Sequence, residues 1–356
     1  MLNALVQRLA RANQARRRSQ FAPARRLFQS VAAATRQHDL RQEAWHGVAD
    51  CSRLLGDFSQ AIKAYERALA LVPADELSDK ADLTAGLGLA YRGAGKPVLA
   101  LRYLKLAQKD FARLHDLTGL AFSAWALGGA WRIAGFPLKG LAELEDAWKR
   151  YQKLKDEEGL SYTACALGGV NRMLGRWKES RRHYAAANRR MRARKDAFGV
   201  AYSYCGLGNA CRMEGDLKGA LAYFKKAEKR YAKIGDKVSY AYTLWSIATT
   251  QKLLWQGQAA LSSTAKAEKL FKATGDERGL AYAALNRAEL HFLQRKNALA
   301  LRDLKTARHY ARPFAWELRH VRALACLMDG NAAGALKAYQ GSGSGFAAQG
   351  FPVSWP

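Results

Sequence analysis

The clearest copy of a recurring pattern in this sequence is Tyr204-Cys205-Gly206-Leu207-Gly208-Asn209-Ala210-Cys211-Arg212. Its middle residue belongs to a column of small residues that recurs every 40 positions in the central part of the chain and at slightly shorter intervals toward both ends. The column comprises Ala12, Ala49, Gly88, Gly128, Gly168, Gly208, Ala248, Ala288 and Ala323. Repetition at such an interval is typical of proteins built from stacked copies of one small unit.

A second column of small residues follows the first by twelve positions. It comprises Ala24, Ala61, Ala100, Gly140, Ser180, Ala220, Ala260, Ala300 and Ala335. Each unit also contains two apolar stretches at helical spacing, separated by a turn such as Gly215-Asp216. Two helices can cross closely only where no bulky side chain intervenes, so the columns predict a helical hairpin in every unit. A single hairpin cannot bury both faces, and we therefore expect an all-α solenoid of about nine stacked hairpins.

Composition favours helices and argues against several other classes of protein. The chain contains only four isoleucines and ten valines among 49% hydrophobic residues, and this scarcity of β-branched residues is unfavourable for sheets. No apolar run approaches the ~18 residues of a membrane span. The five cysteines show neither paired spacing nor a ligand-like spacing to histidine, which favours a reducing compartment. We therefore expect a cytoplasmic protein.

The repeated units resemble the tetratricopeptide repeat family. One unit contains Tyr204-x2-Leu207-Gly208-x2-Cys211 followed by Ala220-x3-Phe224 and Ala227, and another contains Trp45-x2-Val48-Ala49, Ala61-x3-Tyr65, Ala68 and Pro73. Both follow the family pattern W-x2-L-G-x2-Y, A-x3-F and P. The resemblance covers residues 5–340, although the units run near 40 residues rather than 34. It implies a right-handed superhelical solenoid, with the first helix of each hairpin on the concave surface.

The resemblance also suggests how the chain is divided. We expect residues 1–340 to form the solenoid, with a basic N-terminal capping hairpin at about 1–38. Residues 341–356 then form a Gly/Ser linker and an apolar tail that contains Phe351 and Trp355. The tail could cover the last repeat, bind another protein or be disordered.

Two further columns lie on the first helix of the units. One holds seven consecutive cations and then a phenylalanine: Arg16, Arg53, Arg92, Arg132, Arg172, Arg212, Lys252 and Phe292. The other lies ten residues earlier on the same helices and holds Phe122, Tyr162, Tyr202, Tyr242 and Tyr282. Ten residues correspond to about 1000° of helical rotation, so the two columns lie ~80° apart around the helix and ~15 Å apart along it.

The cation column has two interpretations, and the sequence leaves both open. The cations could face an anionic partner, or they could pair with acids on the adjacent repeat. Acidic residues occur mainly toward the two ends of this surface, at Asp50, Asp82 and Glu289. Small residues between the columns, such as Gly129 and Gly206, could likewise serve close helix packing or the approach of a ligand backbone.

A catalytic role has no support in the sequence, which contains no phosphate-binding loop, zinc-binding helix or nucleophile elbow. The seven histidines show no recurring carboxylate partner, and we expect neither a metal nor a cofactor. The family resemblance favours a protein-binding scaffold whose basic, tyrosine-lined groove captures an extended acidic segment of a partner protein. The expected contact residues are Arg53, Arg92, Arg132, Arg172, Arg212, Lys252, Phe122, Tyr162, Tyr202, Tyr242 and Tyr282.

The high net positive charge is also compatible with a second function. The sequence has 58 lysines and arginines against 30 acidic residues, a net charge of +28. Seven of these cations crowd residues 181–195, which lie on the convex side according to the resemblance, and they form either a solvated face or a footprint for a polyanion. Binding of single-stranded RNA is therefore the alternative function, and a substrate-presenting subunit of an enzyme complex is the third.

Overall fold

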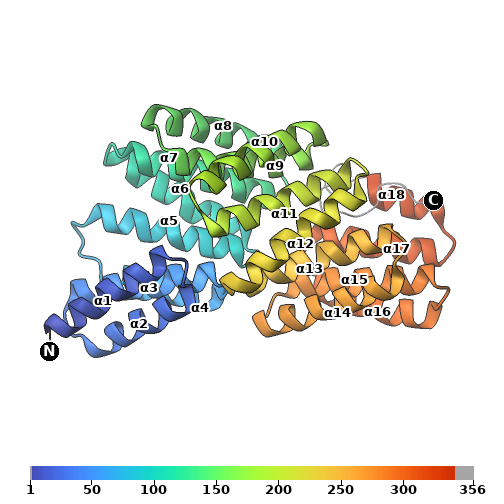
Figure 1. The fold of residues 1–356 in the computed structure, drawn as a ribbon, viewed down its shortest axis with the longest axis horizontal. Helices are drawn as coiled ribbons and strands as arrows, with labels where there is room; N and C mark the ends of the chain where they lie inside the picture. The colour runs from blue at the N-terminus through green and yellow to red at the C-terminus, as the bar shows by residue number, and fades with distance from the viewer. Residues whose placement is uncertain (1, 341–356) are drawn as a thin grey trace. The chain divides into compact units, whose positions relative to one another are not determined.

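The computed structural model describes residues 2–340, which form eighteen α-helices and contain no strand (Figure 1). The interpretations of residues 341–356 fall outside the described residues. The helices are α1 (Leu2–Arg17), α2 (Phe21–Ala34), α3 (His38–Leu54), α4 (Phe58–Leu69), α5 (Leu77–Gly93), α6 (Pro97–Arg113), α7 (Leu117–Ile133), α8 (Pro137–Leu154), α9 (Glu157–Met173), α10 (Trp177–Ala193), α11 (Ala197–Met213), α12 (Leu217–Ile234), α13 (Lys237–Leu253), α14 (Gly257–Thr274), α15 (Glu277–Leu293), α16 (Asn297–Ala311), α17 (Ala315–Met328) and α18 (Ala332–Gln340).

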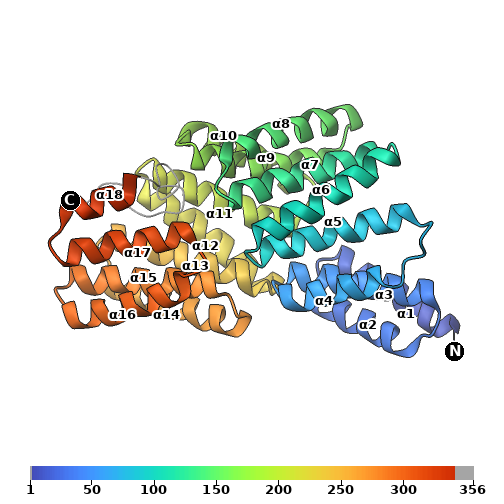
Figure 2. The ribbon, with the colours of Figure 1, turned by 180° about the vertical axis from the view of Figure 1, so that it is seen from behind.

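The described residues divide into two compact units. The first comprises residues 2–170, 189–199 and 233–236, and the second comprises residues 171–188, 200–232 and 237–340. Within the first unit, α1 to α8 form four consecutive helical hairpins, each packed on the next (Figure 2). Within the second unit, α13 to α18 form three more hairpins in the same manner (Figure 2). Stacked helical hairpins confirm the fold class that the two small-residue columns predict.

The two columns meet where the helices of a hairpin cross. In the α7–α8 hairpin, a Cβ placed on Gly140 would lie only 2.8 Å from the carbonyl oxygen of Gly128. In the α11–α12 hairpin, a Cβ on Gly208 would lie 2.7 Å from the ring of Phe224. Bulky side chains therefore have no room at the crossing, and every member of both columns is buried.

The long repeat is explained by long helices. In one repeat, α7 has 17 residues and α8 has 18, and only residues 134–136 separate them. The connection from α8 to α9 is shorter still, at residues 155–156. The residues beyond the usual 34 of the family therefore extend both helices by about a turn.

The turn inside each hairpin requires a left-handed backbone. Gly135 adopts a φ of +88° between α7 and α8, a conformation that glycine reaches without steric cost. Trp255 occupies the equivalent place between α13 and α14 with a φ of +60°, and its side chain is 75% exposed.

Large apolar side chains on the even-numbered helices fill the space between hairpins. The aromatic side chains that are almost fully buried are Phe28, Tyr65, Phe111, Phe224, Tyr231 and Phe271. Among residues 2–340, each helix is either too short or too polar to cross a bilayer.

Candidate functional site

The cation column occupies the last turn of successive odd-numbered helices. Its members lie at the C-terminal ends of α1, α3, α5, α7, α9, α11 and α13. The carbonyl groups at a helix C-terminus carry partial negative charge, and a cation there contributes roughly 0.3–1 kcal/mol of stability. The column thus has a structural reason that sequence reasoning missed, and only the further contacts of each cation bear on binding.

Asp50 neutralises the first two cations of the column in the first unit. Arg16 Nη1 lies 2.7 Å from one carboxylate oxygen of Asp50, and Arg53 Nη2 lies 3.3 Å from the other. The hydroxyl of Tyr65 also donates to Asp50 at 2.6 Å. Burial alone would raise the pKa of Asp50, but Arg53, His46 and the Tyr65 hydrogen bond outweigh it and hold the pKa at about 2.

Glu289 neutralises the last cation of the column in the second unit. Its carboxylate forms an ion pair with Lys252, and both side chains are more than nine-tenths buried. The other carboxylate oxygen lies 2.7 Å from Nε2 of the buried His320. Burial would raise the pKa of Glu289, but Lys252 and His320 hold it at about 2. At both ends of the column, pairing between adjacent repeats is therefore the interpretation that the structure supports.

Arg92 and Arg16 are both cations of the column in the first unit, but they face different residues of the next repeat. Arg16 faces the acid Asp50, whereas Arg92 faces Gly129. Nη1 of Arg92 donates to the backbone carbonyl oxygen of Ala126 at 3.3 Å, and the guanidinium lies 5.1 Å from the ring of Trp125. A Cβ on Gly129 would collide with Nη1 of Arg92. Gly129 lies three residues before Arg132, just as Asp50 lies three residues before Arg53, so the two occupy equivalent positions. At this place the glycine thus makes room for an arginine of the preceding repeat.

Arg132 is the half-buried cation at the end of α7. Its side chain makes no hydrogen bond or ion pair with any residue between 2 and 340. The guanidinium is therefore open to an anion from outside the described part of the chain.

Arg212 is buried in the second unit without a carboxylate. Only 5% of the residue is exposed, and its guanidinium donates to the Ser246 carbonyl oxygen at 3.3 Å and to Asn209 Oδ1 at 2.8 Å. Its Nε is buried and makes no hydrogen bond within the described residues. Burial, and to a lesser degree the charge of Arg172, lower the pKa of Arg212 to about 9. Arg172 has contacts of its own within the chain.

Two tyrosines of the aromatic column bind aspartates that cap the first helix of the next repeat. The hydroxyl of Tyr162 lies 2.8 Å from Oδ2 of Asp196, and that of Tyr242 lies 3.3 Å from Oδ1 of Asp276. Each aspartate also accepts a 2.8 Å hydrogen bond from the backbone N–H three residues further on. Burial raises the pKa of both tyrosines, and the carboxylates raise it further. The sequence predicts these hydroxyls as donors to a partner, but here they join one repeat to the next.

The remaining members of the aromatic column differ from one another. The hydroxyl of Tyr282 donates to the buried carboxylate of Glu317, and Phe122 packs against Trp125 with ring centres 5.6 Å apart. Tyr202 is 38% exposed, and its hydroxyl makes no hydrogen bond within residues 2–340. Of this column, Tyr202 is the most accessible to a partner.

Sequence reasoning missed the column of capping aspartates. The signal is Asp-x-x-Gly at intervals of 40 residues, in which the aspartate accepts from the glycine N–H and so satisfies a free donor of the first helical turn. The pairs are Asp116 with Gly119, Asp156 with Gly159, Asp196 with Gly199, and Asp276 with Gly279.

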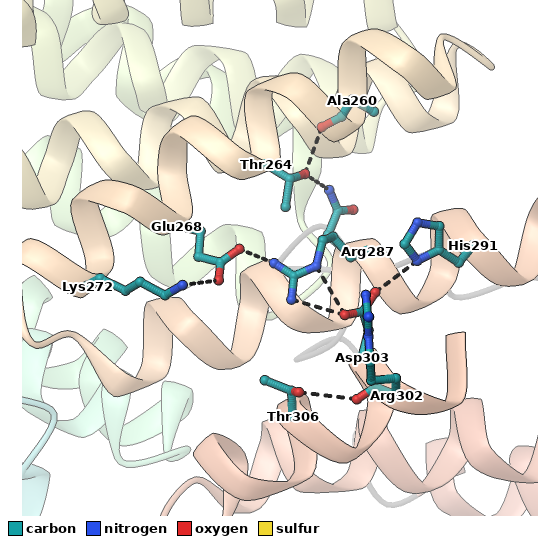
Figure 3. A network of polar contacts seen from close by, with 10 residues as sticks. Ala260, Thr264, Glu268, Lys272, Arg287, His291, Arg302, Asp303 and Thr306 are labelled. Carbon is teal, nitrogen blue, oxygen red and sulfur yellow. Dashed lines mark hydrogen bonds and ion pairs between the residues drawn. The ribbon is translucent and has the colours of Figure 1, made fainter. Parts of the chain in front are cut away.

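Another polar network lies between α14, α15 and α16 in the second unit (Figure 3). Arg287 forms ion pairs with Glu268 and, at 3.2 Å, with Asp303 (Figure 3). Lys272 joins Glu268 at 2.8 Å, and Nδ1 of His291 lies 2.9 Å from Asp303. His291, like His320, therefore has a carboxylate partner that the sequence did not reveal. These charges neutralise one another inside the unit.

Comparisons with known proteins agree on the repeat. The sequence profile of the tetratricopeptide repeat matches residues 42–75 and residues 159–233. No curated protein sequence matches the chain.

Solved structures share the fold at low sequence identity. A Rap protein complexed with competence and sporulation factor has a TM-score of 0.70 and 14% identity, with 98% of this chain and 99% of that chain covered. NprR in complex with its cognate peptide NprX has a TM-score of 0.58 and 13% identity, with 92% and 99% covered. The APC/C hetero-tetramer Cut9–Hcn1 has a TM-score of 0.60 and 15% identity, with 88% and 55% covered. The chain therefore contains sequence matches to the tetratricopeptide repeat at residues 42–75 and 159–233, and its stacked long hairpins share the fold of these solved structures.

Proposed function

We propose that this chain is a non-catalytic cytoplasmic scaffold that binds an extended acidic segment of a partner protein. Carboxylates of the segment contact the cation column, and its other side chains pack near the exposed part of the aromatic column. Proteins of the same fold support a binding role, since a Rap protein holds competence and sporulation factor and NprR holds its cognate peptide NprX.

The observation that carries this proposal is the buried charge of Arg212. A buried cation without a counter-charge is unfavourable, because neither water nor a carboxylate compensates for its lost hydration. Arg212 is 5% exposed, and its hydrogen-bond acceptors within the described chain are a carbonyl oxygen and an amide oxygen. Its guanidinium also lies 5.6 Å from the ring of Phe224 and 6.0 Å from that of Trp245, but no carboxylate of the described chain pairs with it. A carboxylate from a partner supplies the missing charge, and a hydrogen bond to a charged group contributes about 1.5–3 kcal/mol.

Arg132 supports the same proposal in the first unit. Its side chain is half-buried and has no ion pair within residues 2–340, so a carboxylate can bind it without displacing another. Arg53 and Lys252 differ, because Asp50 and Glu289 already neutralise them. We therefore assign the main role to Arg132 and Arg212 and a smaller role to the two neutralised cations.

The experiment compares two variants of equal charge. The site variant carries Arg132→Gln and Arg212→Gln, and the control carries Lys225→Gln and Lys229→Gln, two exposed positions on α12. Both variants lose two positive charges, so long-range attraction of an anion should weaken equally. The probe is a fluorescein-labelled octaglutamate peptide, and its binding is followed by fluorescence anisotropy.

We expect the site variant to bind the peptide at least tenfold more weakly than the parent, which corresponds to about 1.4 kcal/mol. The control should lose far less. Equal losses of affinity in the two variants would mean that the column contributes only its general positive charge. A parent chain that ignores the peptide, or a site variant that binds it as the parent does, would refute the proposal. Circular dichroism melts of both variants show whether either change acts through folding.

A further inference from the structure

An open depression of about 930 Å³ lies in the second unit, where α10 begins and α11 ends. Its walls include Arg176, Trp177, Lys178, Arg182, Met213 and Glu214. None of these residues belongs to the cation column or the aromatic column. The depression is therefore separate in composition from the site of the proposed function.

Positive charge exceeds negative charge in this depression. Arg181 and Glu214 neutralise each other at 2.7 Å across one wall. Arg176, Lys178 and Arg182 form no ion pair within residues 2–340, and Glu179 is the remaining acid of the lining. Three unneutralised cations thus share a concave surface with one free carboxylate, which favours an anionic ligand.

The local helix does not account for these cations. Arg176 directly precedes α10, and Lys178 lies in its first turn. Backbone N–H groups give a helix N-terminus partial positive charge, so cations there are unfavourable. The cation column has the opposite arrangement, since its members lie at helix C-termini. An anion that binds in the depression would compensate for both the side-chain charges and the helix end.

Trp177 adds a flat apolar surface next to the cations. The residue is half-buried and lines the depression together with Met213. An indole ring stacks on the face of any nucleobase, whatever the base sequence, while arginine binds phosphate through paired hydrogen bonds. An aromatic surface beside unneutralised arginines is the combination that a nucleotide requires.

We propose that this depression binds a nucleoside phosphate, with the base on Trp177 and the phosphate on Arg176 and Arg182. The ligand is either a nucleotide of single-stranded RNA or a free nucleotide, since both present the same chemistry. This site is independent of the binding of an acidic segment, and either proposal can fail without the other.

The test uses the full chain and fluorescein-labelled octauridylate, with anisotropy as the measurement and ATP as the competitor. Trp177→Ala removes the stacking surface, and Trp177→Phe retains an aromatic ring. Arg176→Gln with Arg182→Gln removes two phosphate contacts. Lys225→Gln with Lys229→Gln is the control of equal charge, at exposed positions of α12 outside the lining.

We expect Trp177→Ala to weaken RNA binding about tenfold and Trp177→Phe to retain most of it. The double arginine variant should bind at least tenfold more weakly, with a salt dependence shallower by about 1.4 in log–log slope, because each phosphate contact contributes ~0.7. The control should keep the parent affinity within a few-fold. Displacement by equimolar ATP identifies a free nucleotide as the ligand, and resistance to ATP identifies the RNA strand.

A second measurement does not depend on how the variants fold. RNA that contains 4-thiouridine is crosslinked to the parent chain by light, and the attached peptide is identified by mass spectrometry. The proposal requires crosslinks within residues 175–185 or at the end of α11. Crosslinks elsewhere, full binding by Trp177→Ala, or equal losses in the arginine variant and the control would each overturn it. Binding of phosphatidylserine vesicles through Trp177, without RNA or ATP binding, would overturn it as well.

Discussion

The hydroxyl of Tyr162 donates a hydrogen bond of 2.8 Å to Oδ2 of Asp196, a residue 34 positions later that caps the first helix of the next repeat. Tyr242 and Asp276 form the same bond, at 3.3 Å, two repeats further along the sequence. A tyrosine that was expected to face a partner thus connects two repeats. Asp196 accepts hydrogen bonds from both the Gly199 N–H and the Tyr162 hydroxyl.

Tyr162→Phe should lower the free energy of unfolding by about 1.5 kcal/mol, because the half-buried carboxylate of Asp196 loses a donor. Urea denaturation followed by circular dichroism measures the change. Tyr202→Phe is the matched control, since the Tyr202 hydroxyl has no partner within residues 2–340, and its effect should stay within ~0.5 kcal/mol. Similar losses in both variants would show that the hydroxyl bond is not the cause.

Gly140→Ala should destabilise the chain by about 1–3 kcal/mol, because the new methyl group would lie 2.8 Å from a backbone carbonyl oxygen, which has little freedom to move. Gly129→Ala should be nearly neutral. Its methyl group meets the end of the long Arg92 side chain, which can shift more easily than a backbone carbonyl, and alanine in a helix gains up to ~1 kcal/mol over glycine. Thermal melts separate the two cases, and a Gly140→Ala variant as stable as the parent would place the helix crossing elsewhere.

Glu289→Gln should cost about 3–5 kcal/mol at pH 7, because it leaves Lys252 buried without its counter-charge. The pKa of Glu289 falls from an ordinary 4.5 to about 2 in the folded chain, so ionised Glu289 favours folding. That contribution is complete above pH 4.5 and is lost as the pH falls toward 2. The difference between parent and variant in urea titrations should therefore shrink across this range. A difference that stays constant with pH would argue against an ionised Glu289.

Arg212→Met should raise the free energy of unfolding by about 1–3 kcal/mol, because an apolar side chain of similar length removes an uncompensated buried charge. The same substitution should weaken binding of the octaglutamate peptide. Thermal melts and anisotropy on one preparation test both effects together. A less stable variant would mean that the hydrogen bonds to Ser246 and Asn209 outweigh the cost of the buried charge.

The fold could be predicted from the sequence because helix crossings demand small residues at fixed places. Gly128 and Gly140 lie twelve positions apart in the sequence and in contact in the structure, as the two columns require. Every repeat has small residues at these two places, so the alignment of one weak repeat can be checked against the others. The same repeat pattern placed the cations at equivalent positions of successive odd-numbered helices, and in the structure these positions are the C-terminal ends.

The role of each cation could not be predicted in the same way. Identical positions in the column have different partners, since Arg16 meets Asp50 while Arg92 meets a backbone carbonyl next to Gly129. The partner lies on the following repeat, and its identity depends on the residue three places before the next cation. This position, three residues before the column, holds Asp50 and Glu289 toward the two ends and Gly129 in α7. The contrast can be recognised in the sequence once the geometry is known.

The glycine opposite Arg92 also bears on how such a protein can change over generations. Every glycine codon is a single base change from a codon for aspartate or glutamate. An acid at Gly129 would lie against the guanidinium of Arg92, as Asp50 lies against that of Arg16. A single base change can therefore add or remove a counter-charge beside one cation of the column while the helical hairpins stay as they are, so the charge along this column can change faster than the fold.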